Sequence, residues 1–344
     1  EISLGLVGSE MCIRDRVIAE QLDAMAYIME DCAKKQKNIT EECRSNLQDI
    51  AYRARERGIK VIDEQLWEKE NGRWQLVMKV MVKDGCVTTR ELTKAVAGAL
   101  NRRMIPEKDT KTLIGKGVNL YTYEEEPRFQ AIYGVARMVK DGAAVSGDNF
   151  SFLEPESGKM VMCLSDGMGS GSLACKESEM VIELVEKFLE AGFDVETAAR
   201  MMNSAMVMKG QEDLFSTVDI SELDLYDGTC RFYKIGAAAT FIRRNGIVEC
   251  LISTSLPVGV SYKLDMEKSE KDLYNGDFLV MVSDGVLEYL HVPNPEETMQ
   301  EIIESIETNN ATILAKRILE RVLLFTGGKA ADDMTVLATA IWEK

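Results

Sequence analysis

Two apolar runs of five residues, MVMCL and FLVMV, each end in the same tripeptide, Ser-Asp-Gly. The first run leads to Asp166 and the second to Asp284. Runs of this length that are bounded by turn residues are typical of strands inside a sheet. An acidic residue at the end of such a strand lies near a buried edge, where an uncompensated negative charge is costly. The chain must therefore fold around two buried strands that each deliver a carboxylate.

Further acidic residues stand beside strand-like segments. Asp148 lies in VSGDN, and Asp332 and Asp333 precede the apolar stretch MTVLATA. A single Asp-Gly is more often a turn or a helix cap than a metal ligand, and Asp227-Gly228 is predicted to be only a turn. Two Ser-Asp-Gly copies together with DDMT favour a common site. Converging carboxylates repel one another unless cations lie between them, and Mg²⁺ or Mn²⁺ prefers oxygen ligands.

Other classes of site fit the sequence poorly. The glycine loop GMGSGSLA, from Gly167, lacks the lysine of a Walker A loop and the spacing of a dinucleotide fingerprint. The eight cysteines include no CxxC pair, and His291 is the only histidine, which disfavours zinc and Ser-His-Asp or Cys-His catalysis. A formal charge of -16 disfavours binding to nucleic acid or anionic lipid.

The pattern of elements predicts an α+β fold with two sheets covered by helices. The predicted strands are 60–68, 73–82, 118–126, 127–139, 160–165, 216–226, 230–236, 239–244, 247–252, 277–283 and 334–342, and the predicted helices are 88–104, 171–190, 194–208, 296–306 and 311–325. Asn71-Gly72 predicts a hairpin, and Thr88 with Glu91 predicts a capping box. The strands 118–126 and 127–139 are expected to pair with each other.

The N-terminal part is of a different kind. Residues 1–16 resemble a translated sequencing adaptor and are excluded from fold reasoning, although a frayed native N-terminus is the alternative. Residues 17–57 show apolar positions at helical spacing and predict one long amphipathic helix. Such a helix serves either as a homodimer seam or as an element packed on a neighbour, and the sequence leaves both open.

Taken in order, SGDNF, LSDGMGSG, MVSDGVLE and DDMTVLA resemble the motifs of the metal-dependent Ser/Thr protein phosphatases of the phosphatase 2C type, the PPM superfamily. Residues 215–246 and the segment LPVGV resemble the bacterial branch that regulates sigma factors, above all the stage II sporulation protein E (SpoIIE) family. The resemblance implies a phosphatase domain over 118–344, preceded by a regulatory region over 17–117 that contains the long helix.

The resemblance also implies a four-layer αββα sandwich with two Mn²⁺ or Mg²⁺ ions between its sheets. Asp166 would bridge both ions, and Asp148 and the carbonyl of Gly167 would serve one of them. Asp284 and Asp332 would serve the other, with Asp333 as the reserve choice. These four aspartates, Asp148, Asp166, Asp284 and Asp332, are the predicted catalytic residues. Water activated by the two ions would attack phosphorus directly. Arg137 is a candidate for phosphate binding, and a surface arginine is the alternative.

The implied substrate is a phosphorylated anti-sigma factor antagonist of the STAS type, whose dephosphorylation activates a sporulation sigma factor. Alternatives are a stress-response or other partner-switching phosphatase of the same superfamily, and a catalytically silent signalling scaffold. No run of about 20 apolar residues is present. This part of the protein is therefore expected in the cytoplasm, and a membrane anchor is expected only from an upstream domain.

Overall fold

The computed structural model describes residues 25–26, 41–68, 72–107, 110–155, 158–169, 171–208, 215–325 and 327–344. The chain forms two compact units, one ending at Pro127 and the other beginning at Arg128, and each is described by itself. Residues 1–16 and most of the helix predicted over 17–57 lie outside the described residues. The described part of that helix includes α2 (Glu41–Glu56). No helix in the described part of the chain combines the length and the hydropathy of a membrane span.

The described residues of the first unit form a four-stranded sheet and two helices. After α2 it contains β1 (Ile59–Glu68), β2 (Trp74–Val82), β3 (Val87–Thr88), α3 (Thr89–Leu100), β4 (Met104–Pro106), β5 (Leu113–Ile114) and β6 (Asn119–Glu125). The strand order is β1-β2-β6-β4, and β3 pairs with β5. Alternate residues of β2, such as Leu76 and Val80, are buried in one cluster with Ile50 of α2 and Val96 of α3. The predicted hairpin between 60–68 and 73–82 is confirmed.

The predicted pairing of 118–126 with 127–139 is wrong. Strand β6 pairs with β2 and β4, whereas β7 (Phe129–Met138) pairs with β16 (Met334–Glu343) in the second unit. Tyr121 and Tyr123 of β6 are buried in the core of the first unit, which holds this strand there. The boundary between the compact units therefore follows Pro127, and the phosphatase domain over 118–344 stays a prediction.

The capping box predicted at the start of α3 does not form. Thr88 precedes the helix with an extended backbone, but its side chain makes no capping hydrogen bond. Its backbone belongs to β3, where it pairs with Leu113 of β5. Glu91 forms an ion pair with Lys94 at 2.7 Å instead of bonding back to the helix start.

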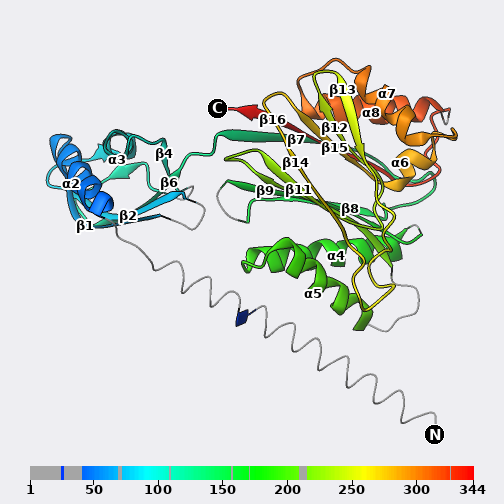
Figure 1. Ribbon diagram of the computed structural model, residues 1–344, viewed down its shortest axis with the longest axis horizontal. Coiled ribbons are helices and arrows are strands. Elements are labelled where there is room, and N and C mark those ends of the chain that lie inside the picture. The colour runs from blue at the N-terminus through cyan, green and yellow to red at the C-terminus, as the bar shows by residue number, and fades with distance from the viewer. Residues whose placement is uncertain are drawn as a thin grey trace, which may run out of the picture. The chain divides into compact units, whose positions relative to one another are not determined.

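In the part of the second unit that the structure describes, there are two five-stranded antiparallel sheets and five helices (Figure 1). Between β7 and β16 its elements are β8 (Asp148–Leu153), β9 (Lys159–Gly167), α4 (Ser172–Glu190), α5 (Val195–Met208), β10 (Ser216–Asp224), β11 (Thr229–Ile235), β12 (Thr240–Arg244), β13 (Ile247–Leu251), β14 (Glu267–Asp272), β15 (Phe278–Val282), α6 (Asp284–Glu288), α7 (Pro295–Glu304) and α8 (Ala311–Phe325). One sheet has the order β14-β11-β10-β9-β8, and the other has the order β13-β12-β15-β16-β7.

The apolar run of β9 is buried on both faces of its sheet. Met162 and Leu164 pack in the cluster between the two sheets. Val161 and Cys163 pack on the opposite face, in the cluster that includes residues of α4 and α5. Since successive side chains of a strand point to opposite faces, a strand covered on both sides must be apolar throughout.

Strand β15 repeats this arrangement in the second sheet. Leu279 and Met281 lie between the sheets, while Val280 and Val282 pack in the cluster that contains residues of α7 and α8. Helices α4 and α5 cover one outer face of the sandwich, and α7 and α8 cover the other (Figure 1). The prediction of an α+β fold with four layers, αββα, is confirmed.

The four short strands predicted after residue 215 form, but they belong to two sheets. Strands β10 and β11 pair in one sheet, and β12 and β13 pair in the other, joined by a turn in which Asn245 and Gly246 have positive φ angles of 51° and 82°. The chain crosses between the sheets over residues 236–239. Strand β14 was not predicted, because its sequence EKSEKD has no alternating apolar residues.

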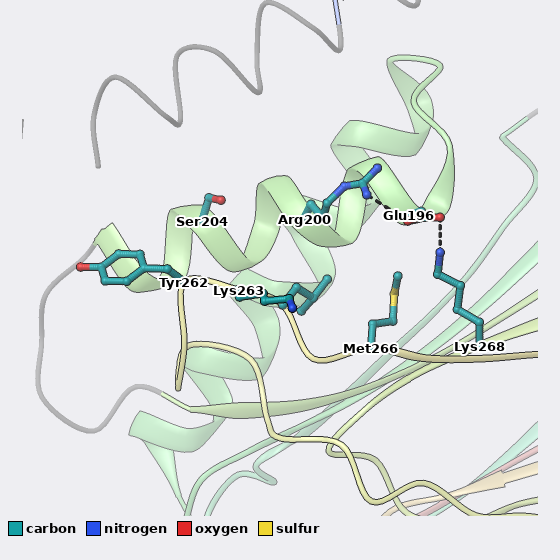
Figure 2. Close-up of a pocket in the computed structure, with 8 residues that line it drawn as sticks. Glu196, Arg200, Ser204, Tyr262, Lys263, Met266 and Lys268 are labelled. Carbon is teal, nitrogen blue, oxygen red and sulfur yellow. Dashed lines mark hydrogen bonds and ion pairs between the residues drawn. The ribbon is translucent and has the colours of Figure 1, made fainter. Parts of the chain in front are cut away.

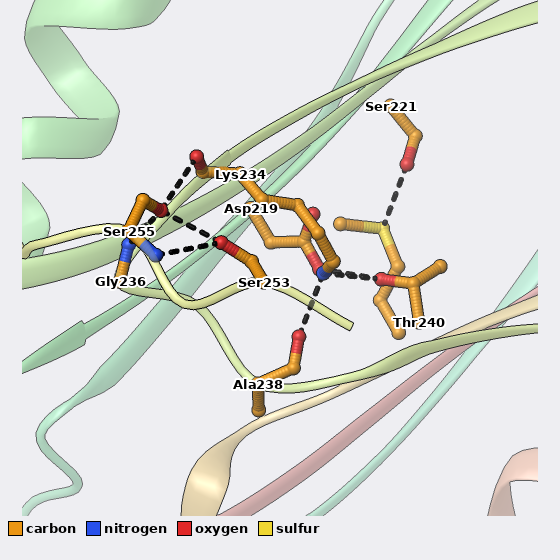
Figure 3. A network of polar contacts seen from close by, with 9 residues as sticks. Asp219, Ser221, Lys234, Gly236, Ala238, Thr240, Ser253 and Ser255 are labelled. Carbon is orange, nitrogen blue, oxygen red and sulfur yellow. Dashed lines mark hydrogen bonds and ion pairs between the residues drawn. The ribbon is translucent and has the colours of Figure 1, made fainter. Parts of the chain in front are cut away.

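A buried ion pair holds this crossover (Figure 3). Asp219 of β10 and Lys234 of β11 are opposite each other, and both side chains are buried. The ammonium group of Lys234 donates to Asp219 Oδ2 at 2.5 Å, to the carbonyl oxygen of Ala238 at 2.6 Å and to Thr240 Oγ1 at 2.8 Å. Because Thr240 begins β12, this network ties the two sheets together where the chain passes between them.

Candidate active site

Two of the predicted carboxylates meet at one end of the first sheet. Asp148 is the first residue of β8, Asp166 is the last but one of β9, and the two are direct partners in the antiparallel register. Partners in such a register point to the same face of the sheet. The apolar run of β9 fixes which residues face the helices, and so it directs Asp166 to the face between the sheets.

A third carboxylate comes from the second sheet. Asp284 is the first residue of α6, directly after β15. The N–H of Ser283 donates to the carbonyl of Thr335 at 3.0 Å, and the N–H of Thr335 donates to Ser283 Oγ at 2.9 Å. These bonds join the end of β15 to the start of β16. A Cβ added at Gly285 would lie 3.3 Å from the Cβ of Asp332, so Asp332 lies beside the first turn of α6.

The electrostatics show that three carboxyl groups act on one another. Asp148 is completely buried, and neither of its carboxylate oxygens has a hydrogen-bond partner. Burial raises the pKa of Asp148, the neighbouring side chains of Thr335, Ser283 and Asp166 act in the opposite direction, and the charge of Asp284 adds a smaller contribution in the same direction as burial. Burial, with contributions first from Asp284 and then from Asp148, raises the pKa of Asp166 to about 11. Without a cation this group of side chains is therefore strongly unfavourable when ionised.

Asp332 and Asp333 differ in their surroundings. Asp333 is buried, and its two oxygens accept hydrogen bonds from the N–H groups of Lys140 at 2.9 Å and Gly147 at 2.7 Å. Asp332 is half-buried, and the ammonium group of Lys140 lies 3.6 Å from its Oδ1. Asp333 thus anchors the segment before Asp148, whereas Asp332 faces the first turn of α6. This arrangement favours Asp332 over Asp333 as a ligand.

Glycines allow the backbone to pack closely around the carboxylates. A Cβ added at Gly167 would lie 2.1 Å from the carbonyl oxygen of Ala174 in α4, which no real side chain tolerates. A Cβ added at Gly147 would lie 3.1 Å from the Cβ of Ala174 and 3.6 Å from Asp166 Oδ1. The close approach of α4 therefore requires a glycine at position 167, and Gly147 leaves room for the tight contact between Ala174 and the segment before Asp148.

Several residues that hold the site were not predicted. Ser216 Oγ donates to the carbonyl oxygen of Asp166 at 2.7 Å. Asn149 Nδ2 donates to Ser178 Oγ at 2.8 Å, and Ser178 Oγ donates to the carbonyl oxygen of Gly147. Ser178 lies one helical turn after Ala174, so its position on the inner face of α4 could be predicted from helical spacing. The contact partner of Ser216 has no comparable signal in the sequence.

Arg137, the candidate for phosphate binding, lies on β7 with an exposed side chain. Its Nη2 donates to the carbonyl oxygen of Asp148 at 2.5 Å. The guanidinium group therefore lies beside the backbone that carries Asp148. No phosphate contact follows from this bond alone.

A pocket of about 250 Å³ lies elsewhere in this unit, between α5 and residues 262–268 (Figure 2). It is lined by Glu196, Arg200, Ser204, Tyr262, Lys263, Leu264, Met266 and Lys268. Glu196 forms ion pairs with Arg200 at 2.9 Å and with Lys268. None of the predicted site residues lines this pocket, so it is not the candidate active site.

The carboxylate oxygens of this site are the kind of ligand that hard divalent cations prefer. Among the described residues no group of three or more His, Cys, Asp or Glu side chains has the arrangement of a complete metal site. The two partnerless oxygens of Asp148 and the raised pKa of Asp166 nevertheless indicate a demand for positive charge at this point. Carboxylate oxygens without nearby imidazole or thiolate ligands suit Mg²⁺ or Mn²⁺.

Comparisons with known proteins identify the family of this chain. The family profile of Stage II sporulation protein E (SpoIIE) matches residues 156–341. The chain is 28% identical to Stage II sporulation protein E of Bacillus subtilis (strain 168) over 327 residues, which are 95% of this chain and 40% of that protein. It is 35% identical to Phosphoserine phosphatase RsbX of the same organism over 86 residues, which are 25% of this chain and 41% of RsbX.

A solved structure extends the similarity to nearly the whole chain. The PP2C phosphatase domain of SpoIIE from Bacillus subtilis, solved with a fragment of its regulatory domain, has a TM-score of 0.71 and 27% identity, and the match covers 98% of this chain and 96% of that chain. The chain spans about 40% of the length of the Bacillus subtilis relative. The family match includes Asp166, Gly167, Asp284 and Asp332, and it begins after Asp148. With a fold of the PP2C phosphatase type and a family match over more than half of its length, the chain belongs to the Stage II sporulation protein E family.

Proposed function

We propose that this chain is a metal-dependent protein serine phosphatase. The observation that carries the proposal is the register pair Asp148–Asp166, two adjoining carboxyl groups whose pKa values are both raised and which Asp284 approaches from the other sheet. Membership of the SpoIIE family and the similarity to a named phosphoserine phosphatase support it. The proposed substrate is a phosphorylated STAS-type anti-sigma factor antagonist, and the proposed output is activation of a sporulation sigma factor.

The residues of the site have separate proposed roles. Asp166 would hold both of two Mn²⁺ or Mg²⁺ ions, with Asp148 and the Gly167 carbonyl on one and with Asp284 and Asp332 on the other. When bound, such ions supply water activation and neutralise charge on the phosphoryl group. Asp333 keeps the segment before Asp148 in place through its two backbone hydrogen bonds.

Two alternatives remain distinct from this proposal. The similarity to RsbX favours a second candidate, a stress-response or other partner-switching phosphatase with the same chemistry. A catalytically silent scaffold would keep the fold without turnover, and the complete set of aspartates argues against it. For the part before the phosphatase domain we propose a regulatory role, with a homodimer through the N-terminal helix and a cytoplasmic location as further predictions.

Phosphate release tests the proposal. A STAS-domain protein phosphorylated on serine is incubated with the chain, with and without Mn²⁺, using the wild type, Asp284→Asn and Asp272→Asn. Asp272 is an exposed carboxylate on the edge strand β14 and serves as the matched control. We expect release that requires Mn²⁺, persists in Asp272→Asn and is lost in Asp284→Asn. Absence of release from folded wild type with Mn²⁺ present would favour the scaffold.

A further inference from the structure

Two uncharged segments border the carboxylates. Residues 142–147 read GAAVSG and residues 167–175 read GMGSGSLAC, in a chain of which 28% is charged. One segment leads into Asp148, and the other follows Asp166. A site for an anionic phosphoryl group is usually lined with Lys or Arg side chains. Neither segment supplies one.

Close contacts hold the two segments together around the site. The N–H of Gly167 donates to the carbonyl oxygen of Gly147 at 3.3 Å. A Cβ added at Gly147 would lie 3.1 Å from the Cβ of Ala174. The hydroxyl of Ser178 also donates to the Gly147 carbonyl. Exposed side chains on these two segments are therefore only a few residues along the chain from Asp148 or Asp166.

Three of these side chains are large, apolar and exposed to solvent. They are Val145, Met168 and Leu173, which we name the apolar rim, with exposed fractions of 41%, 59% and 63%. Val145 lies two residues before Gly147, Met168 follows Gly167, and Leu173 precedes Ala174. Single exposed apolar residues are common on protein surfaces, but three that flank one catalytic centre indicate a contact surface.

Two cations near this site are engaged by the protein, and neither lies on the bordering segments. The ammonium group of Lys140 lies 3.6 Å from Asp332, and Arg137 donates to the carbonyl of Asp148. A phosphoserine protein that approaches a chain of charge -16 is therefore not recruited by free basic side chains on the bordering segments. The large exposed side chains on the two bordering segments are apolar, and the exposed Lys176 follows the second segment.

We propose that the apolar rim binds an apolar patch of the phosphoprotein substrate next to its phosphoserine, and so distinguishes that protein from small phosphate esters. This inference rests on the proposed function. Burial of exposed apolar side chains provides affinity without depending on charge. The phosphoryl group itself would be held by the metal site, and the rim would hold the surrounding protein surface.

The test compares two substrates on the full chain in Mn²⁺, a serine-phosphorylated STAS-domain protein and p-nitrophenyl phosphate. The variants are Met168→Ser and Leu173→Ser. Leu324→Ser on α8 is the matched control, since this leucine is also helical and is 78% exposed. For the rim variants we expect the ratio of kcat/KM for the protein to kcat/KM for the ester to fall about tenfold, the effect of losing one well-buried apolar contact. The ratio for Leu324→Ser should equal that of the wild type.

A binding measurement separates docking from turnover. In the Asp284→Asn background, calorimetric titration with the phosphoprotein should show a Kd about tenfold higher when Leu173→Ser is added. If the wild type is active and the rim variants keep both the wild-type kcat/KM ratio and the wild-type Kd, the proposed docking role of the apolar rim is wrong. The proposed function is not affected by that result. Hydrolysis of neither substrate by the wild type would overturn the proposed function. Hydrolysis of the ester alone would overturn the proposed substrate and the rim together.

Discussion

Asp148 and Asp166 lie directly opposite each other at the ends of β8 and β9. Asp148 is completely buried, and both of its carboxylate oxygens lack hydrogen-bond partners. Two carboxyl groups in this position cannot both be ionised in the metal-free protein without a large cost. The demand for cations therefore arises from the register of the sheet, and Gly167, the first glycine of the loop after Asp166, lets α4 approach.

In the metal-free protein we expect the free energy of unfolding to fall as the pH rises from about 5 to about 9. The pKa of Asp166 is about 11 in the folded chain, against about 4 in the unfolded chain. The folded state thus binds more protons throughout this window. The stabilisation is complete below about pH 4 and is lost progressively toward about pH 11, by at most about 1.4 kcal/mol per pH unit.

Urea unfolding in EDTA at a series of pH values measures this slope. Asp166→Asn should flatten it, because the amide does not titrate. Asp272→Asn, which removes an exposed carboxylate on β14, should keep the wild-type slope. Equal slopes in the wild type and Asp166→Asn would show that this carboxyl group does not carry the pH dependence.

The neighbours Asp332 and Asp333 should respond differently to substitution by alanine. Asp333→Ala removes the acceptor of two backbone N–H groups, and should lower the stability by about 1–3 kcal/mol for each group left unsatisfied. Asp332→Ala removes the acceptor of one backbone N–H group, that of Asp333 at 3.0 Å, so it should lower the metal-free stability less than Asp333→Ala, and it should abolish the rise in Tm that Mn²⁺ produces in the wild type. Thermal unfolding with and without Mn²⁺ measures both effects. The opposite pattern would assign the ligand to Asp333.

The sequence predicted the layers of the second unit well, because strands such as β9 and β15 are apolar on both faces. The Ser-Asp-Gly that follows each apolar run also marks where the run ends. It also predicted which aspartates end those strands. It did not predict that β6 belongs to the first unit, since the alternation of Tyr121 and Tyr123 does not say which sheet they join. Nor could it predict the bond from Ser216 to the Asp166 carbonyl, which depends on pairing between residues 50 positions apart.

Gly167→Ala should impair both the packing of α4 and the site. The added Cβ would lie 2.1 Å from the Ala174 carbonyl oxygen, so the start of α4 must move. Overpacking of this kind typically costs about 1–3 kcal/mol, and the apparent affinity for Mn²⁺ should fall with it. Gly115→Ala is the control, because nothing lies within 4 Å of its added Cβ. Calorimetric titration with Mn²⁺ measures the affinity of both variants. An affinity of Gly167→Ala equal to that of the wild type would show that the close approach of α4 does not position the site.

Lys234→Met should be among the most destabilising single substitutions in the second unit. Asp219 would then keep a buried negative charge with only the hydroxyl of Thr240 as a donor, at a typical cost of about 3–5 kcal/mol. Adding Asp219→Leu should recover much of this loss, since the cost comes from the unpaired charge. The control Lys187→Met breaks an exposed pair with Glu183, which is worth no more than about 0.5 kcal/mol. Urea unfolding compares the three variants with the wild type. A loss in Lys234→Met no larger than in Lys187→Met would mean that the crossover between the sheets is held by the apolar core alone.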